Sequence, residues 1–288
     1  FGQCLVVEEL SRACAGVAVS YAASALGGFP ILMFGTEEQK RKFMPEIASG
    51  SKLAAFALTE PDAGSDAGNI RTTATRDGDY YVLNGTKQWI TNGGEADIYI
   101  VIATLDPAKG PRGMTAFIVE KGTLGFDFGK KEKKMGIRAS STTELIFRDC
   151  KIPVANLLDR EGRGFLVAMR TLDKTRPGVA AQAVGIAQGA LDKAAEYATT
   201  RVQFGKKIGE FQAVEHMLAD MATQIEAARS LVYNVAKMID SGEGHVTKAA
   251  AMAKLFASDV AMKVTCDAVQ IFGGYGYMRD YPVGKMMR

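Results

Sequence analysis

The hydrophobic period of this sequence changes twice along the chain, and no other feature constrains the fold as strongly. Residues 1–52 have a helical pattern, and residues 161–288 are rich in Ala, Met, Leu, Lys and Glu, which favour helices. Residues 53–160 instead contain short β-rich runs punctuated by Gly and Pro, as in a compact barrel or sandwich. Strands and helices do not alternate, which argues against a doubly wound sheet. The order predicts an α+β protein with a helical domain (1–52), a middle β domain (53–160) and a helical bundle (161–288).

Local signals place the expected helices. One helix is expected over residues 5–26. Another begins at Thr36, whose hydroxyl can cap free backbone amides while Gln39 stands at the capping-box position, and Gly50 ends it. The last region is expected to hold three long helices of a bundle, over residues 180–200, 211–239 and 247–272.

Glycines and one proline mark special points in the last region. Gly185 and Gly189 could permit close contact with another helix, and Gly205 and Gly273 are typical of helix ends. Pro177 disfavours helical geometry at the residue before it, so this segment is expected to deviate from a regular helix.

Strand signals fill the middle region. The turn Asp77-Gly78 predicts a hairpin between its two flanking runs. The expected strands lie at 54–58, 70–75, 80–83, 97–104, 115–119 and 144–147.

Composition and spacing exclude several classes of function. The net charge of +3, without a basic run among spaced aromatics, does not indicate nucleic-acid binding. No apolar stretch is expected to reach the roughly 18 residues of a membrane span. The four cysteines lack CxxC spacing, and His216 and His245 each stand alone, so neither a disulfide framework nor a metal site is predicted. Rossmann and P-loop glycine motifs are absent. Because the chain starts at Phe1 and stops at Arg288 without a closing element, we expect a fragment.

Three segments can carry chemistry, although each also has a plain structural interpretation. The run 56–66 leads from a strand into a turn rich in backbone donors and hydroxyls, or is a surface loop. The run 87–94 places Trp89 and Thr91 on one side of a strand, where they could cover a flat ring and bond its edge, although a lone tryptophan is more often core. The runs 201–206 and 270–276 combine an arginine with glycine-rich helix ends, which suits a pyrophosphate or simply stops helices.

Together these segments resemble the acyl-CoA dehydrogenases, most closely the short- and medium-chain, butyryl-CoA dehydrogenase-like branch. The resemblance runs essentially end to end, and five motifs in the right order make it specific. They lie at 58–66, 85–93, 134–142, 201–206 and 270–276. The family fold implied is a helical domain, a middle β domain and a C-terminal four-helix bundle.

The resemblance also implies FAD in an extended pose. Phe56, Leu58 and Thr59 would line the flavin, Trp89 would lie over the ring, and Thr91 would reach toward N5. Further cofactor contacts would come from Ser65 and Gln212, and, toward the FAD of a neighbouring subunit, from Arg201, Gln203, Phe204, Gln270, Gly273 and Gly274. Shared sites imply a homo-oligomer, usually a tetramer in this family.

On the substrate side, the resemblance implies that Ser65 touches the CoA arm. Asp173, Lys174, Thr175 and Arg176 would line the thioester and pantetheine. Removing the weakly acidic α-proton needs a carboxylate base, and Thr175 occupies one of the two positions where similar enzymes carry a glutamate. We therefore expect the base to be a glutamate beyond Arg288, with no catalytic base within this chain.

The implied activity is α,β-dehydrogenation of a short- or medium-chain acyl-CoA, as in fatty-acid β-oxidation, with electrons passed to electron-transfer flavoprotein. A flavin oxidase or monooxygenase, an enoyl-CoA reductase and a non-catalytic CoA- or flavin-binding subunit remain open alternatives. The implied compartment is the cytoplasm for a bacterial protein and the mitochondrial matrix for a eukaryotic one. Acyl chain length and branching stay open.

Overall fold

A computed structural model describes residues 1–244 and 246–288, so His245 lies outside the described residues. The chain divides into two compact units. Unit 1 comprises Phe1–Val19, Lys134–Ala139 and Asp173–Arg288, and unit 2 comprises Ser20–Lys133 and Ser140–Leu172. The division predicted from the sequence follows hydrophobic period, whereas these units follow packing.

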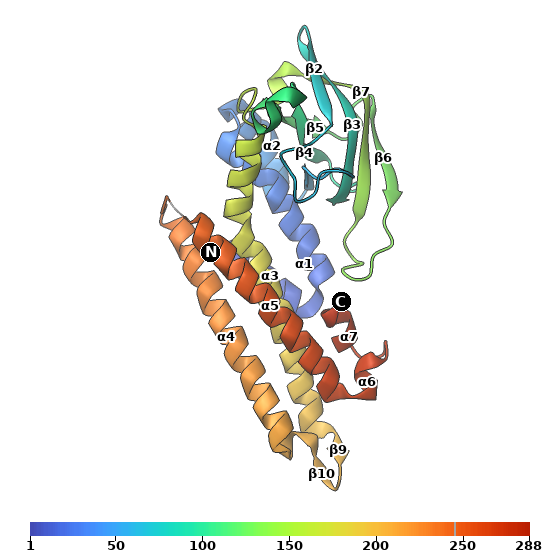
Figure 1. Cartoon of the computed structure of the whole chain (residues 1–288), viewed down its shortest axis with the longest axis vertical. Coiled ribbons are helices and arrows are strands. Elements are labelled where there is room, and N and C mark those ends of the chain that lie inside the picture. Colours follow the sequence, from blue (N-terminus) through green and yellow to red (C-terminus); the bar gives the residue numbers. More distant parts are fainter. Residues whose placement is uncertain (245) are drawn as a thin grey trace. The chain divides into compact units, whose positions relative to one another are not determined.

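Unit 2 is built on one eight-stranded sheet (Figure 1). The path runs β6-β7-β3-β2-β4-β5-β8, and β1 adds to β4 in parallel. The strands are β1 (Ala54–Ala57), β2 (Thr73–Asp77), β3 (Tyr80–Thr91), β4 (Ile98–Thr104), β5 (Met114–Glu120), β6 (Phe126–Lys131), β7 (Thr142–Pro153) and β8 (Leu157–Leu158). The predicted hairpin at Asp77-Gly78 joins β2 to β3, and Gly78 has the positive φ of 58° that this turn requires.

The sheet separates two apolar cores. β4 is buried at every position, so its side chains alternate between the two cores. One core packs the aromatic rings of Tyr99, Phe126 and Phe147 together. The other packs the sheet against Ile31 of α1 (Gly2–Phe34) and Phe43 of α2 (Glu37–Ser49). The predicted capping box of α2 is confirmed, with Thr36 and Gln39 bonded reciprocally and Gly50 in the left-handed conformation at the helix end.

Helix α1 corrects two expectations. It runs to Phe34 rather than to residue 26, with a break in helical geometry at Cys14. By length and composition it could cross a membrane, so the expectation that no stretch is long enough is wrong. Its contacts within unit 2 are those of a core helix: the Ser24 hydroxyl accepts from Ala54 N at 2.8 Å, and a side chain at Gly27 would meet the backbone of β1.

Unit 1 is a four-helix bundle formed by the first part of α1, the later part of α3 (Gly164–Thr200), α4 (Gln212–Asp240) and α5 (Thr247–Phe272). Two short helices, α6 (Gly274–Tyr277) and α7 (Val283–Met287), follow α5 (Figure 1). The predicted close helix contact is confirmed, because a Cβ at Gly185 would lie 2.1 Å from the Glu8 carbonyl oxygen. At Gly189 the same atom would lie 2.3 Å from the Arg12 carbonyl oxygen.

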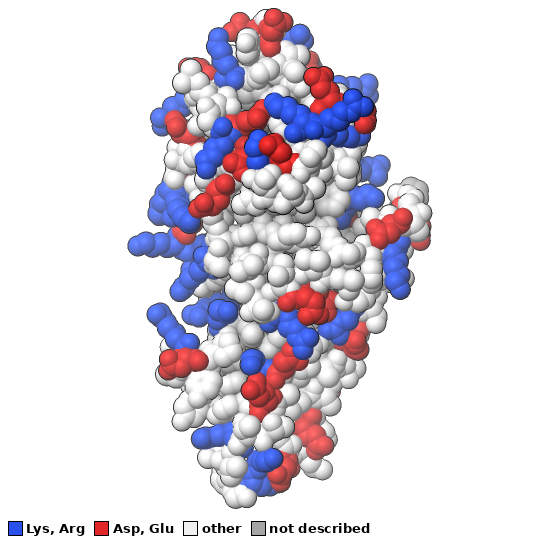
Figure 2. Space-filling model, turned by 180° about the vertical axis from the view of Figure 1, so that it is seen from behind, with Lys and Arg blue, Asp and Glu red and all other residues white. Residues whose placement is uncertain are grey.

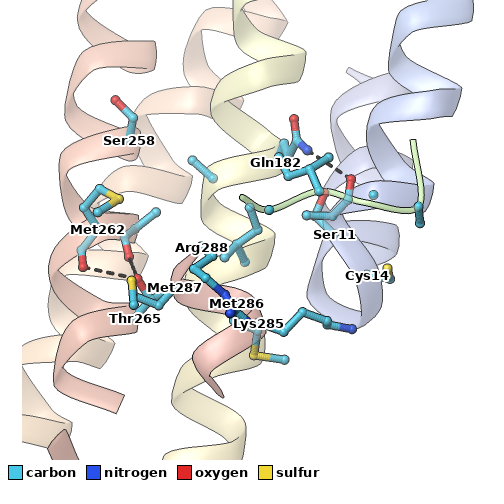
Figure 3. Close-up of a pocket in the computed structure, with 18 of the residues that line it drawn as sticks. Ser11, Cys14, Gln182, Ser258, Met262, Thr265, Lys285, Met286, Met287 and Arg288 are labelled. Atoms are coloured by element: carbon cyan, nitrogen blue, oxygen red, sulfur yellow. Dashed lines mark hydrogen bonds between the residues drawn. The ribbon is translucent and has the colours of Figure 1, made fainter. Parts of the chain in front are cut away.

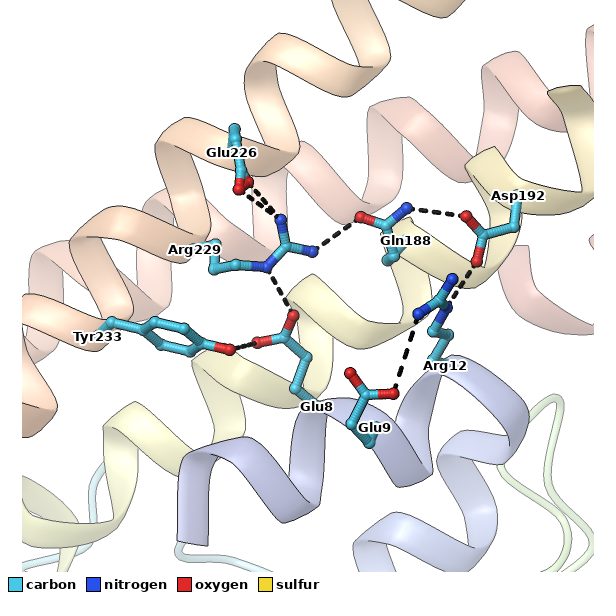
Figure 4. A network of polar contacts seen from close by, with 8 residues as sticks. All are labelled: Glu8, Glu9, Arg12, Gln188, Asp192, Glu226, Arg229 and Tyr233. Atoms are coloured by element: carbon cyan, nitrogen blue, oxygen red, sulfur yellow. Dashed lines mark hydrogen bonds and ion pairs between the residues drawn. The ribbon is translucent and has the colours of Figure 1, made fainter. Parts of the chain in front are cut away.

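A polar network joins three helices of this bundle (Figure 4). Glu8 of α1 is buried and accepts hydrogen bonds from Arg229 at 2.7 Å and Tyr233 at 2.8 Å, both on α4. Arg229 also donates to Gln188 of α3 at 2.7 Å. Burial and the Glu8 carboxylate raise the pKa of Tyr233 to about 12. The network aligns α1, α3 and α4 through charge-assisted bonds.

Several boundaries differ from the sequence expectations. Helix α3 starts at Gly164 and continues through Pro177, so the expected deviation before this proline is wrong. Gly205 has a positive φ of 80° and lies in a hairpin between β9 (Val202–Gln203) and β10 (Lys206–Lys207) rather than at a helix end. Gly273 does end α5, as predicted. Strands β6 and β8 were not expected from the sequence. Short 3-10 turns lie at Pro107–Gly113, Val154–Asn156 and Ile208–Glu210.

Candidate functional site: a platform cavity in unit 2

A cavity of about 710 Å³ opens in unit 2 at the end of β3. Two of the three predicted segments contribute to it, one from β3 and the other from the end of β1 and the turn that follows it. The predicted residues that line it are Phe56, Leu58, Thr59, Ser65, Trp89 and Thr91. Three apolar residues of α3 line it as well: Phe165, Met169 and Leu172. The cavity is therefore a built site, since residues distant in sequence converge on it.

A β-bulge presents the tryptophan to this cavity. β3 and β7 pair Lys87 with Leu145 but Ile90 with Thr143, so β3 holds one extra residue. Trp89 lies at this bulge with a φ of 56°, and the residue is 59% exposed. The sequence predicted that Trp89 and Thr91 share a side, and both line the cavity. The regular strand assumed for that prediction is absent, because the bulge sets the direction of Trp89.

A buried ion pair between Lys87 and Glu60 contacts the backbone of Leu58, which lines the cavity. Lys87 is 0% exposed at its side chain, and its ammonium donates to Glu60 Oε1 at 2.7 Å and to the Leu58 carbonyl at 2.9 Å. Burial lowers the pKa of Lys87 to about 8, against the opposing effect of Glu60. Burial opposes ionisation of Glu60, but Lys87 and nearby donors outweigh it and lower the Glu60 pKa. The sequence showed Glu60 only as a turn residue, and its pairing with a lysine 27 positions away had no local signal.

The cavity suits a flat, apolar ring with polar edges. Trp89 offers an exposed aromatic face, Phe56 and Leu58 offer apolar contact, and the hydroxyls of Thr59 and Thr91 can bond ring-edge atoms. Among the described carboxylates, only Asp66 lines the cavity. Glu60 is held by Lys87, and Asp62 pairs with Arg71 on the surface. The residues present therefore fit an isoalloxazine ring.

The third predicted segment forms a separate cavity of about 510 Å³ in unit 1. Four of the residues that the sequence assigned to the FAD of a neighbouring subunit line this cavity together: Arg201, Gln203, Gly273 and Gly274. Arg201 lies 5.4 Å from the ring centroid of Tyr275. Three other predicted residues do not line this cavity: Phe204, at the tip of the β9–β10 hairpin, Gln212 and Gln270. Phe204 is 95% exposed, and its outward position is consistent with a contact to another molecule.

The predicted substrate residues Asp173, Lys174, Thr175 and Arg176 lie on α3 in unit 1, directly after Leu172, which lines the cavity of unit 2. Asp173 pairs with Arg176 and accepts from the Thr247 hydroxyl at 2.7 Å. Thr175 is buried. The prediction of a glutamate base beyond Arg288 concerns residues outside this chain and stays a prediction.

Unit 1 also contains an apolar cavity of about 460 Å³ (Figure 3). It is lined by α1 around the break at Cys14, by α3, by α5, by the chain end from Lys285 to Arg288, and by residues 135–139 of the motif at 134–142. None of the residues predicted to bind cofactor or substrate lines it.

On the face shown in Figure 2, acidic and basic side chains are interspersed, which agrees with the small net charge.

The residues of the unit 2 cavity suit a flat redox ring held on a β domain. Comparisons with known families identify the family. Acyl-CoA dehydrogenase N-terminal, middle and C-terminal domains match residues 1–51, 55–150 and 162–288. The chain belongs to the acyl-CoA dehydrogenase family, whose members use FAD.

Individual relatives agree with this assignment. The chain is 56% identical to a short-chain specific acyl-CoA dehydrogenase of Megasphaera elsdenii, over 99% of this chain and 74% of that protein. It superimposes on the structure of butyryl-CoA dehydrogenase from the same organism with a TM-score of 0.97, at 56% identity, covering 99% of this chain and 74% of that one. A chain in the structure of the electron transferring flavoprotein of Acidaminococcus fermentans gives the same TM-score and identity, covering 99% and 75%.

Two further relatives bear on cofactor and direction. A structure of an FAD-dependent dehydrogenase matches with a TM-score of 0.94 at 37% identity, covering 99% of this chain and 77% of that one. An acryloyl-CoA reductase (NADH) of Anaerotignum propionicum is 50% identical over 99% of this chain and 72% of that protein.

Proposed function

We propose that this enzyme oxidises a short-chain or medium-chain acyl-CoA to the trans-2-enoyl-CoA with FAD and passes the electrons to an electron-transfer flavoprotein. The observation that carries the proposal is the unit 2 cavity, where Trp89 and Thr91 of β3 meet Leu58 and Thr59 of the turn after β1. The names of the M. elsdenii and A. fermentans relatives support the substrate class and the electron acceptor.

Each cavity residue has a role in this reaction. A bound FAD would supply the acceptor for the hydride from the β-carbon of the substrate. Among the residues that line the cavity, Trp89 would cover one face of the ring, Thr59 and Thr91 would hold its edge, and Phe56 and Leu58 would exclude water. Ser65 lines the same cavity and is assigned to the CoA arm or the cofactor. Asp173 is already engaged by Arg176 and Thr247, which favours an orienting role on the thioester side over a base role.

The unit 1 cavity supports a cofactor site shared between subunits. Arg201 can pair with a pyrophosphate, and the backbone at Gly273 and Gly274 is open to close approach because no atom of the described residues lies within 4 Å of their would-be Cβ positions. We assign this cavity, with the exposed Phe204, to the FAD of a neighbouring subunit. A homotetramer, as is usual in the family, would meet this requirement.

The cavity assignment is tested by the only tryptophan in the chain. FAD binding to the apoprotein is expected to quench Trp89 emission, and Thr91→Val is expected to weaken FAD binding about five-fold or more because one ring-edge bond is lost. Thr75→Val, on an exposed position of β2, is the matched control and should bind FAD as the wild type does. FAD binding without any change in Trp89 emission would contradict the assignment.

Anaerobic titration of the holoenzyme with acyl-CoAs of increasing length tests the reaction. Short and medium chains should bleach the flavin, and electron-transfer flavoprotein should restore its colour. Rapid reoxidation in air would instead identify an oxidase. Because an acryloyl-CoA reductase is 50% identical, the reverse direction is the second candidate. Net reduction of an enoyl-CoA under physiological acceptor conditions would favour it.

A further inference from the structure

Lys87 connects the two segments that line the unit 2 cavity, the turn after β1 and the end of β3. It belongs to β3, two residues before the bulged Trp89, and its ammonium reaches the Leu58 carbonyl and the Glu60 carboxylate. The next residue repeats the link, since Gln88 N donates to the Thr59 carbonyl at 2.9 Å. Three consecutive residues of the turn are thus bonded to two consecutive residues of β3.

Glu60 extends this link to the other side of the turn. Its carboxylate accepts from the backbone amides of Arg71 at 2.6 Å and Thr72 at 3.0 Å, in addition to Lys87. A buried carboxylate that accepts hydrogen bonds from several backbone amides holds those amides in one geometry. Any other conformation of the turn would leave a buried charge without its hydrogen-bond donors. The pair therefore restricts the turn to one position relative to the bulge.

We propose that Lys87, through Glu60, is a positioning residue that holds Leu58 and Thr59 opposite Trp89 and thereby sets flavin affinity and flavin reduction potential. It lines no part of the cavity and so acts through its neighbours. A plain packing role would use an apolar side chain, which fills the same space without the cost of burying two charges. This inference rests on the proposed flavin site.

The test uses the full chain and two variants. Lys87→Met alone leaves the buried Glu60 carboxylate without its cation and can fail to fold, so Lys87→Met/Glu60→Gln removes both charges together with the bond to the Leu58 carbonyl. Lys151→Met is the matched control: this lysine lies on β7 in the same sheet, is exposed and pairs with Asp77. FAD affinity is measured by quenching of Trp89 well below the melting temperature of each apoprotein.

The double variant is expected to bind FAD about ten-fold or more weakly. Its flavin potential should move to a more negative value, because Thr59 no longer holds the ring edge where reduction adds charge. The control should match the wild type in both. A double variant with a lower melting temperature but wild-type FAD affinity and potential would overturn the inference, since only stability would then depend on Lys87. If wild-type FAD binding leaves Trp89 emission unchanged, the flavin site itself is wrong, and the inference falls with it.

Discussion

Two buried glutamates show how differently the two units use an interior charge. Glu60 in unit 2 and Glu8 in unit 1 are equally buried, at 4% exposure. Glu60 is held by one lysine and by backbone amides of its own loop region. Glu8 is held by side chains of a distant helix, Arg229 and Tyr233. The charge in unit 2 therefore fixes a turn beside a cavity, whereas the charge in unit 1 docks helices.

The surroundings differ as well. The side chain of Lys87 has no access to solvent, so its ion pair with Glu60 is a closed pair, one that water does not reach. Arg229 keeps one edge in partial contact with solvent and shares a second carboxylate, Glu226, on the surface. A closed pair depends on both partners, but an open network can replace a lost contact with water or a neighbour. The comparison predicts larger penalties in unit 2 than in unit 1 for the loss of one partner.

Lys87→Met should give the largest effect. It leaves Glu60 ionised and buried without its cation, which typically costs about 3–5 kcal/mol. Urea unfolding should show this loss, while Lys151→Met at an exposed pair should change stability by less than about 0.5 kcal/mol. A loss in Lys87→Met as small as in the control would remove the distinction between the two units.

Gly185→Ala tests whether helix docking in unit 1 depends on backbone contact. The new Cβ would meet the carbonyl oxygen of Glu8, so α1 must move away from α3, at a cost of about 1–3 kcal/mol. Gly178→Ala, on the same helix, meets nothing closer than 3.8 Å. This control should be neutral or slightly stabilising, because alanine favours the helix. Equal thermal shifts for the two variants would contradict close packing at Gly185.

Glu8→Gln should have a smaller effect than either. The amide keeps one acceptor oxygen, and Arg229 keeps Glu226, so a loss of about 1 kcal/mol is expected. Glu9→Gln is the control one residue away, since its contact with Arg12 is exposed and 3.9 Å long. A loss in Glu8→Gln comparable to that of Lys87→Met would show that the network in unit 1 is as closed as the pair in unit 2.

The sequence predicted those parts of the fold that local chemistry determines. Thr36, Gln39 and Gly50 specify both ends of α2, and α5 spans the expected 247–272, with Gly273 at its C-terminal end. Periodicity likewise gave the helix–sheet–helix order. Errors arose where tertiary contacts override a local rule, as in α3, which continues through Pro177 while its residues up to Leu172 pack in unit 2 and those from Asp173 pack in unit 1.

The sequence predicted part of the cavity lining but not what supports it. Six predicted residues between Phe56 and Thr91 line the cavity of unit 2, whereas the lining residues from α1 and α3 had no local signal. The bulge at Trp89 and the pairing of Lys87 with Glu60 depend on register between strands, which no local pattern encodes. A buried lysine in a strand is the one signal that could have indicated the pair, because such a charge requires a partner.

The pH dependence of stability gives the smallest and most specific test of the closed pair. Burial lowers the pKa of Lys87 to about 8, below the ordinary value of 10.5 that the unfolded chain retains. Between these values the unfolded chain binds more protons, so this group makes the free energy of unfolding rise with pH. Relative to Lys87→Met/Glu60→Gln, the wild type should gain a few tenths of a kcal/mol from about pH 7 to about pH 8 and more above it. A difference that stays flat or falls would mean that Glu60 keeps Lys87 protonated, and that the pair in unit 2 is bound more tightly than its burial implies.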